Sequence, residues 1–271
     1  MSFQNLNDDS SSSLHNESII SQFTKQAIPF TQLSEHSNQY GFELIVELAK
    51  PQKGDTVLDV ACGPGIVACE LAKFVSHGTG IDITPAMIEQ AKQMQKERKL
   101  NNITWKIGDI ITLPFDDSSF SLVITRYSFH HLLNPPKVLD EMIRVCKPDG
   151  RIVIIDVTPE SSKANEYNSV EKLRDPSHVK AFTFRELSKM MEESGLVNLE
   201  TKCQNLEMEL EKLLEASFPP HGNKEKIQHL FKEDLQKDNL GMKSFLQENN
   251  NNNNNKIYFY FPISMLLGYK K

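Results

Sequence analysis

Short apolar segments alternate with longer amphipathic stretches through the middle of the chain. Five segments rich in apolar and β-branched residues are predicted to be strands, at 56–61, 78–82, 103–108, 120–125 and 151–157. The stretches between them repeat apolar residues at helical spacing, as Met87, Ile88, Ala91 and Met94 do after the second strand. Strands that alternate with helices predict an α/β fold with a largely parallel sheet.

Two further strands are predicted in the C-terminal third of the chain. Residues 183–186, Thr-Phe-Arg-Glu, form a capping box that begins a helix, and this helix is expected to end at Gly195. Strands are expected at 196–202 and 256–261, so the complete pattern is one seven-stranded sheet with helices. Ligands of such open sheets bind at the carboxyl ends of the strands, which makes the residues just after each strand the informative ones.

Two segments of low complexity differ from this pattern. Residues 1–20 are rich in Ser, Asn and Asp and contain few apolar groups, so a disordered tail is predicted. The asparagine tract at 249–255 is expected to enlarge an exposed loop. Residues 21–271 are predicted to form a single domain with two insertions, one helical at about 160–180 and one of helix plus the Asn tract at about 204–255.

Composition and charge narrow the classes of function. The chain is 39% hydrophobic, and its net charge of -6 opposes binding to nucleic acid or anionic lipid. No apolar run approaches the roughly 18 residues of a spanning helix, so membrane insertion is not expected. The four cysteines form no C-x-x-C pair, so neither a metal site nor a disulfide framework is expected. Without a secretory or mitochondrial targeting pattern, a cytoplasmic location is expected.

A glycine-rich turn follows the first predicted strand. Gly63-Pro64-Gly65 begins a G-x-G-x-x-G/A pattern, and Asp82 ends the next strand 19 residues after Gly63. Such glycines let a ligand approach the backbone and a helix N-terminus, while an acid at that spacing binds a pair of ribose hydroxyls. The pattern predicts a nucleoside ligand without specifying which one.

Asp59 distinguishes between two such ligands. It lies four residues before Gly63, where its carboxylate would face the ligand held by the glycine turn. A dinucleotide diphosphate would meet a like charge there, whereas the cationic S-adenosylmethionine would be attracted. Asp109, just after the third strand, adds a carboxylate that suits the adenine amino group. Three successive strand ends therefore carry one aspartate each, which favours S-adenosylmethionine over NAD.

Taken together, these motifs resemble those of class I S-adenosylmethionine-dependent methyltransferases. The resemblance is to the type-11 group, which includes the ubiquinone and menaquinone biosynthesis C-methyltransferases. It covers about residues 25–203, and the segments that carry it are 57–65, 80–84 with Met87, 108–115, 126–132 and 147–151. The resemblance implies a Rossmann-like fold with a mostly parallel sheet whose last strand is antiparallel. Ser121 departs from the family pattern, which usually has Asp at this position.

The resemblance also implies which residues bind the cofactor. The residues at its methionine portion would be Asp59, Gly63, Gly65 and, through its backbone, Arg126. The residues at its ribose and adenine would be Asp82, Met87, Asp109 and Ile110.

Further candidates lie on the methyl-acceptor side of the predicted site. His130 and His131 follow the fourth strand, and either is a candidate general base, although one could simply stabilise the following turn. Arg174 and His178 are candidate substrate residues in the first insertion, with a salt bridge between Arg174 and Asp175 as the alternative. The aromatic residues of the N-terminal segment, which either line the pocket or pack between helices, are Phe23, Phe30 and Tyr40.

The sequence thus predicts a methyltransferase that transfers a methyl group from S-adenosylmethionine to a small-molecule acceptor by in-line displacement. Two alternatives remain open at this point. One is a methyltransferase-like protein that binds the cofactor without turnover, and the other is an NAD-dependent oxidoreductase, which Asp59 argues against.

Overall fold

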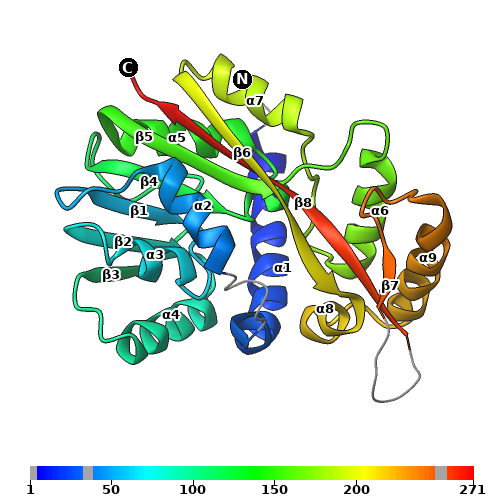
Figure 1. Cartoon of the computed structure of the whole chain (residues 1–271). Coiled ribbons are helices and arrows are strands. Elements are labelled where there is room, and N and C mark those ends of the chain that lie inside the picture. The colour runs from blue at the N-terminus through cyan, green and yellow to red at the C-terminus, as the bar shows by residue number, and fades with distance from the viewer. Residues whose placement is uncertain (1–4, 33–38, 248–254) are drawn as a thin grey trace.

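The chain is built around one mixed β-sheet flanked by helices (Figure 1). This computed structural model describes residues 5–32, 39–247 and 255–271. The sheet runs in the order β3-β2-β1-β4-β5-β8-β6, and a short strand, β7, pairs with β8. The strands are β1 Thr56–Val60, β2 His77–Asp82, β3 Ile103–Ile107, β4 Phe120–Arg126, β5 Cys146–Val157, β6 Val197–Glu209, β7 Phe245–Gln247 and β8 Lys256–Tyr269.

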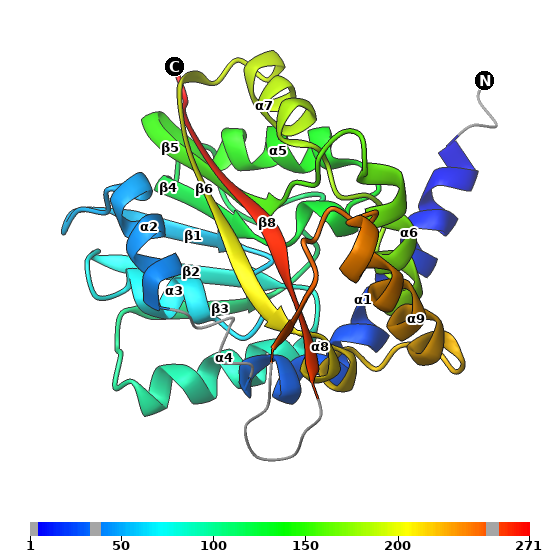
Figure 2. The same ribbon diagram turned by 45° about the vertical axis from the view of Figure 1, so that its right-hand side comes forward.

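The helices lie on both faces of the sheet and beyond its edge (Figure 2). The helix predicted from the capping box is confirmed, since the Thr183 hydroxyl accepts the Glu186 N–H and the Glu186 carboxylate accepts the Thr183 N–H. The helical segments are α1 Asn5–Gln32, α2 Gln39–Ala49, α3 Ile66–Leu71, α4 Pro85–Glu97, the 3₁₀ turn η2 Phe129–His131, α5 Pro135–Val145, α6 Ala164–Arg174, α7 Phe184–Glu193, α8 Leu210–Ser217 and α9 Asn223–Lys237.

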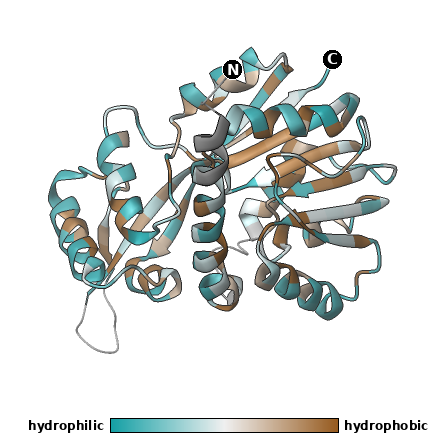
Figure 3. Ribbon diagram, turned by 180° about the vertical axis from the view of Figure 1, so that it is seen from behind, coloured by the Kyte–Doolittle hydropathy of each residue, from teal (hydrophilic) through white to brown (hydrophobic). Residues whose placement is uncertain are grey.

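Alternate residues of the central strands build two separate hydrophobic cores. On β5, Val153 and Ile155 face one core with helices α2, α3, α8 and α9, while Ile152 and Ile154 face the other with α5 and α7. Figure 3 shows the consequence, because the central strands are mostly hydrophobic in colour and the flanking helices are largely hydrophilic. A sheet buried on both faces explains why its strands are nearly continuous apolar runs in the sequence.

The predicted fold class is confirmed. Pairs within β3-β2-β1-β4-β5 are parallel, and β8 runs antiparallel to both β5 and β6. The last strand is longer than predicted and continues through Pro262. Beyond Ile263, the last residue in register with β5, the Pro262 carbonyl still accepts the Thr158 N–H at 2.7 Å, so the proline lies at the end of this ladder, where a missing N–H is tolerated. The sequence pattern did not indicate β7, which is only three residues long.

The N-terminal segment differs from the prediction of a disordered tail over residues 1–20. From Asn5 onward it is the start of helix α1. Long-range contacts hold this helix in place, because the Asn16 amide donates to Asp109 at 2.7 Å and the Gln22 amide donates to the Ser217 carbonyl at 2.6 Å. Such contacts offset the ordering entropy that a Ser- and Asn-rich segment could not offset alone.

The two predicted insertions contain helices, but the second, about 204–255, also reaches into the sheet, since residues 204–209 are the end of β6 and β7 pairs with β8. The first contains α6, and the second contains α8, α9 and β7 along one edge of the molecule (Figure 1). The loop predicted for the asparagine tract lies almost entirely outside the described residues.

Candidate functional site

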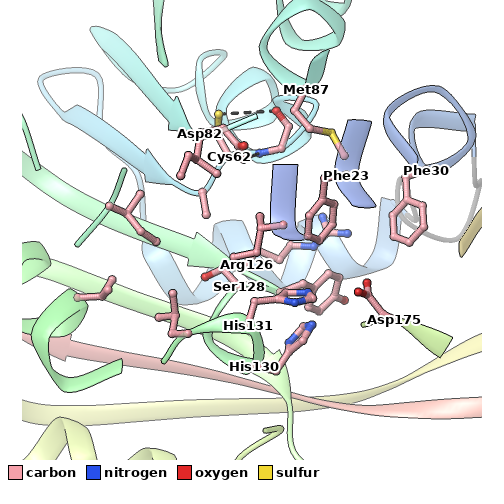
Figure 4. Close-up of a pocket in the computed structure, with 18 of the residues that line it drawn as sticks. Phe23, Phe30, Cys62, Asp82, Met87, Arg126, Ser128, His130, His131 and Asp175 are labelled. Carbon is pink, nitrogen blue, oxygen red and sulfur yellow. Dashed lines mark hydrogen bonds between the residues drawn. The ribbon is translucent and has the colours of Figure 1, made fainter. Parts of the chain in front are cut away.

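A cavity of about 280 Å³ opens at the carboxyl ends of the central strands, beneath helix α1. Figure 4 shows its two sides, with Asp82, Cys62 and Met87 on one side and His130, His131 and Asp175 on the other. The predicted site residues that line it are Asp59, Gly63, Asp82, Met87, Asp109, Ile110, Arg126, His130, His131 and Arg174.

The turn after β1 supplies the floor of the cavity. Ala61 and Gly63 both have positive φ, 54° and 52°, and a side chain built on Gly63 would meet nothing within 4 Å. Gly63 therefore leaves open space beside the backbone for a ligand. Gly65 has a packing role. Its φ is 79°, and an added Cβ would lie 2.5 Å from the Trp105 ring. Gly65 does not line the cavity; it lets the turn pack against Trp105.

Asp82 closes the same turn from the end of β2. Its carboxylate accepts the backbone N–H of Gly63 and of Thr84, each at 2.8 Å. Burial raises the pKa of Asp82, and these two backbone bonds oppose the rise. The carboxylate retains lone pairs for further donors, as a ligand diol requires.

Asp59 is almost completely buried at the end of β1, with 1% of its surface exposed. One carboxylate oxygen accepts the N–H of Ala68 at 3.0 Å. Burial raises the pKa of Asp59 to about 7, which outweighs the effects of the Ala68 N–H and of the positive charge of Arg126. A cation bound nearby would favour the ionised carboxylate, so this position suits a positively charged ligand.

Asp109 and its neighbours form the wall after β3. The Asp109 carboxylate accepts the Ile111 N–H at 2.9 Å and the side-chain amide of Asn16 at 2.7 Å. Asn16 belongs to α1, so the N-terminal helix is tied to the predicted adenine position. Met87 is buried, and both Met87 and Ile110 line the cavity.

The turn η2 presents two adjacent imidazoles to the cavity, with ring centroids 4.2 Å apart. His130 Nδ1 lies 2.6 Å from a carboxylate oxygen of Asp156, the buried acid at the end of β5. Burial lowers the pKa of His130, but the Asp156 charge and hydrogen bond outweigh it, so the pKa is raised overall. His130 therefore retains a proton more readily than an ordinary histidine.

His131 has neutral partners. Its Nδ1 lies 3.1 Å from both the carbonyl oxygen and the hydroxyl of Ser177. Burial, and next the charge of His130, lower the pKa of His131 to about 4. The ring of Phe23 on α1 packs edge-on against it, with centroids 5.1 Å apart. His131 is therefore neutral at physiological pH.

The two predicted substrate residues differ in position. Arg174 lines the cavity, but its guanidinium donates to the Glu171 carboxylate and to the Ser217 hydroxyl. Its ion pair is with Glu171, not with Asp175 as the alternative interpretation supposed. His178 lies outside the cavity lining and hydrogen-bonds Asn168 at 2.7 Å, and burial lowers its pKa to about 2.

Several residues of the site were missed by the sequence interpretation. Those on α1 are Ser12, His15, Asn16 and Ile19. Their signal was the helical spacing of Ile19, Phe23 and Phe30, which the Ser-rich start of the segment obscured. Phe23 and Phe30 do line the cavity, whereas Tyr40 is 60% exposed and does not. The signal for Asp156 was an acid within the otherwise apolar run 152–157.

The sheet order and the acids at its strand ends define the class of Rossmann-like methyltransferases. A family model described as a methyltransferase domain matches residues 51–234, and the chain belongs to this family. The resemblance inferred from the motifs is thereby confirmed. Among the described residues, no helix has both the length and the apolarity needed to cross a membrane.

Individual relatives agree with this assignment. The chain is 29% identical to the uncharacterized methyltransferase YcgJ of Bacillus subtilis over 77% of this chain and 83% of that protein. The crystal structure of YcgJ has a TM-score of 0.76 at 26% identity and covers 86% and 99% of the two chains. The UbiE C-methyltransferase of a Ruegeria species is 30% identical over 42% of this chain. The matched region spans 47% of that protein, which is less than half of its length.

A more distant structure shares only the fold. It is a Haemonchus contortus phosphoethanolamine N-methyltransferase, solved in complex with S-adenosylhomocysteine and its phosphomonomethylethanolamine ligand. The TM-score is 0.56 at 18% identity, over 85% of this chain and 52% of that one.

Proposed function

We propose that this chain is an S-adenosylmethionine-dependent methyltransferase that acts on a small-molecule acceptor. The observation that carries the proposal is the convergence of Asp59, Asp82 and Asp109 on one cavity, from the ends of three successive strands. S-adenosylmethionine carries no phosphate. The diphosphate of a dinucleotide would lie near the buried Asp59 carboxylate and would be repelled by its like charge. The fold shared with a structure that contains S-adenosylhomocysteine supports the same cofactor.

The residues present fit this cofactor. The open space at Gly63 accommodates a ligand against the backbone, and the carboxylate of Asp59 suits the ammonium group of its methionine portion. Asp82 would accept the ribose hydroxyls, and Asp109 with Met87 and Ile110 would hold the adenine. The cofactor supplies a sulfonium methyl group that a nucleophile displaces in line.

The chain's own contribution to the reaction is alignment of the acceptor and removal of its proton. Correct placement of two reactants supplies about 7 to 11 kcal/mol of a barrier of this kind. The apolar side chains of α1 that line the cavity, including Phe23 and Phe30, would exclude water and pack against the acceptor. His130 and His131 are the candidates to accept the proton of an acceptor hydroxyl, amine or acidic carbon.

Methyl transfer is tested by incubating the purified chain with S-adenosylmethionine carrying a labelled methyl group and a small-molecule metabolite extract. The expected result is a labelled small product that is absent when the chain is boiled. Absence of any labelled product, with binding of S-adenosylhomocysteine retained, would favour a binding protein without turnover. A parallel titration with NAD tests the oxidoreductase alternative, and saturable NAD binding without S-adenosylhomocysteine binding would overturn the proposal.

A further inference from the structure

The two histidines of η2 differ in what holds them. The Nδ1 atom of His130 faces a carboxylate directly, at 2.6 Å from Asp156 Oδ1. The other oxygen of Asp156 accepts the backbone N–H of His130 at 3.2 Å, so one acid holds both the ring and the backbone of this residue. His131 instead faces Ser177, whose hydroxyl donates to Asp175 at 2.6 Å. A carboxylate therefore hydrogen-bonds His130 directly, whereas the hydrogen bonds of His131 lead to the Asp175 carboxylate only through the Ser177 hydroxyl.

These contacts fix the tautomer of His130. A carboxylate only accepts hydrogen bonds, so the proton of the neutral imidazole is held on Nδ1 and the lone pair is left on Nε2. Among the residues that the structure describes, Nε2 of His130 has no hydrogen-bond partner, and the residue lines the cavity. The ring is thus oriented with its acceptor nitrogen available to a ligand.

We propose that Asp156 is a positioning residue that makes His130, rather than His131, the proton acceptor of the reaction. This inference rests on the proposed methyl transfer. The nucleophilic atom of the acceptor forms the new bond to the methyl carbon, and the electron pair of the broken carbon–sulfur bond goes to sulfur. The proton of that nucleophilic atom goes to Nε2 of His130, whose positive charge the Asp156 carboxylate stabilises.

Only one of the two rings can hold that proton. Their centroids are 4.2 Å apart, so two imidazolium charges would repel each other in a buried site. Other groups around His130 do not reverse the preference. His178 is neutral, and on α6 the Arg174 and Glu171 charges pair with each other. On α1, His15 contacts the carbonyl oxygen of His131 rather than the His130 ring.

The preference is tested by nitrogen-15 NMR of the full chain with labelled histidine, titrated over pH and compared with the Asp156→Asn variant. This variant keeps an acceptor oxygen for Nδ1 and removes the charge. The chain has eight histidines, and His130→Gln and His131→Gln variants assign the two signals. In the wild type, His130 is expected as the Nδ1–H tautomer with a pKa above its ordinary value. In Asp156→Asn, its proton affinity should fall about tenfold or more, because one neighbouring charge is lost.

Ser177→Ala is the matched control, since it removes the hydroxyl that contacts His131, keeps the carbonyl that also contacts it, and should leave the His130 titration unchanged. An Nε2–H tautomer of His130 in the wild type, or an unchanged His130 titration in folded Asp156→Asn, would overturn the assignment. If Asp156→Asn does not fold, the tautomer of His130 in the wild type still tests the assignment. Titration with S-adenosylhomocysteine separates the two proposals, because a wild type that does not bind it contradicts the cofactor assignment whatever His130 does.

Discussion

The two halves of the cavity are built in different ways. In the cofactor half, backbone N–H groups from short turns bind the carboxylates, as Gly63 and Thr84 bind Asp82. In the acceptor half, side chains distant in sequence bind one another, as His131 and Ser177 do across 46 residues. The carboxylates of the first half are held mainly by backbone N–H groups within 19 residues in the chain, with Asn16 of α1 as a distant partner of Asp109, whereas the contacts of the second half join more distant side chains.

This difference separates what each half contributes to function. A rigid, locally determined half suits a cofactor that does not vary, while an assembled half is free to vary with the acceptor. Changes in the cofactor half should therefore affect S-adenosylhomocysteine binding, and changes in the acceptor half should leave it intact.

The largest effect is expected for Asp82→Ala. Loss of charge-assisted hydrogen bonds to two hydroxyls costs about 3 kcal/mol or more, so S-adenosylhomocysteine should bind roughly 100-fold more weakly. Calorimetric titration measures the change. Asp116→Ala, at an exposed turn acid, is the control and should bind as the wild type does. Unchanged affinity in Asp82→Ala would show that the ribose assignment is wrong.

The next largest effects are expected for substitutions of the two glycines of the turn. One variant should mainly lose stability, and the other should mainly lose ligand affinity. In Gly65→Ala the new methyl group would lie 2.5 Å from Trp105 at a φ of 79°, so the free energy of unfolding should fall by about 2 kcal/mol or more. In Gly63→Ala the methyl group would enter open space, so stability should fall by only about 1 kcal/mol while ligand affinity is lost. Urea unfolding and titration of both variants measure the two effects, and equal losses of stability would contradict the separate roles.

A smaller effect is expected from the ionisation of Asp59, whose pKa burial raises to about 7. With this pKa, the Asp59 carboxyl of the free protein is largely protonated at pH 6, whereas a bound ammonium group requires its ionised form. Affinity for S-adenosylhomocysteine should rise about tenfold between pH 6 and 8. The same titration of Asp59→Asn should give a weak affinity that changes little with pH. A flat profile in the wild type would argue against contact between Asp59 and the ammonium group.

The smallest effect is expected where α1 meets the cofactor half. Asn16→Ala removes the amide that binds Asp109, and one such hydrogen bond is worth about 1 kcal/mol or less at a half-buried carboxylate. Dissociation of S-adenosylhomocysteine, followed by stopped flow, should accelerate about threefold because α1 is held less firmly. Glu17→Ala changes an exposed neighbour on the same helix and should have no effect. Identical rates in both variants would mean that this contact does not retain the ligand.

The sequence predicted the cofactor half because its information is local. The strand, the Gly63 turn and the acid at Asp82 follow one another within one strand–helix–strand unit, and the parallel pairing of β1 with β2 brings them together. The packing of Gly65 against Trp105 was not predicted, since it depends on contact between two elements. The motif identified Gly65 as a cofactor contact, which stays a prediction, and the structure adds a packing role.

The acceptor half was predicted only in part. The adjacent pair His130 and His131 was visible, but its partners Asp156 and Ser177 come from other strands and loops. Helix α1 was missed because its ordering depends on contacts with residues such as Asp109 and Ser217, far along the chain. Local composition predicted disorder, and tertiary contacts reversed it.

The division of the cavity is tested most directly by calorimetric titration of S-adenosylhomocysteine into three proteins: the wild type, Asp82→Ala and Asp156→Asn. The account predicts micromolar or tighter binding to the wild type, a loss of about 100-fold in Asp82→Ala, and an affinity within about threefold of the wild type in Asp156→Asn. If Asp156→Asn loses as much affinity as Asp82→Ala, or if Asp82→Ala binds as the wild type does, the two halves do not have the separate roles assigned to them.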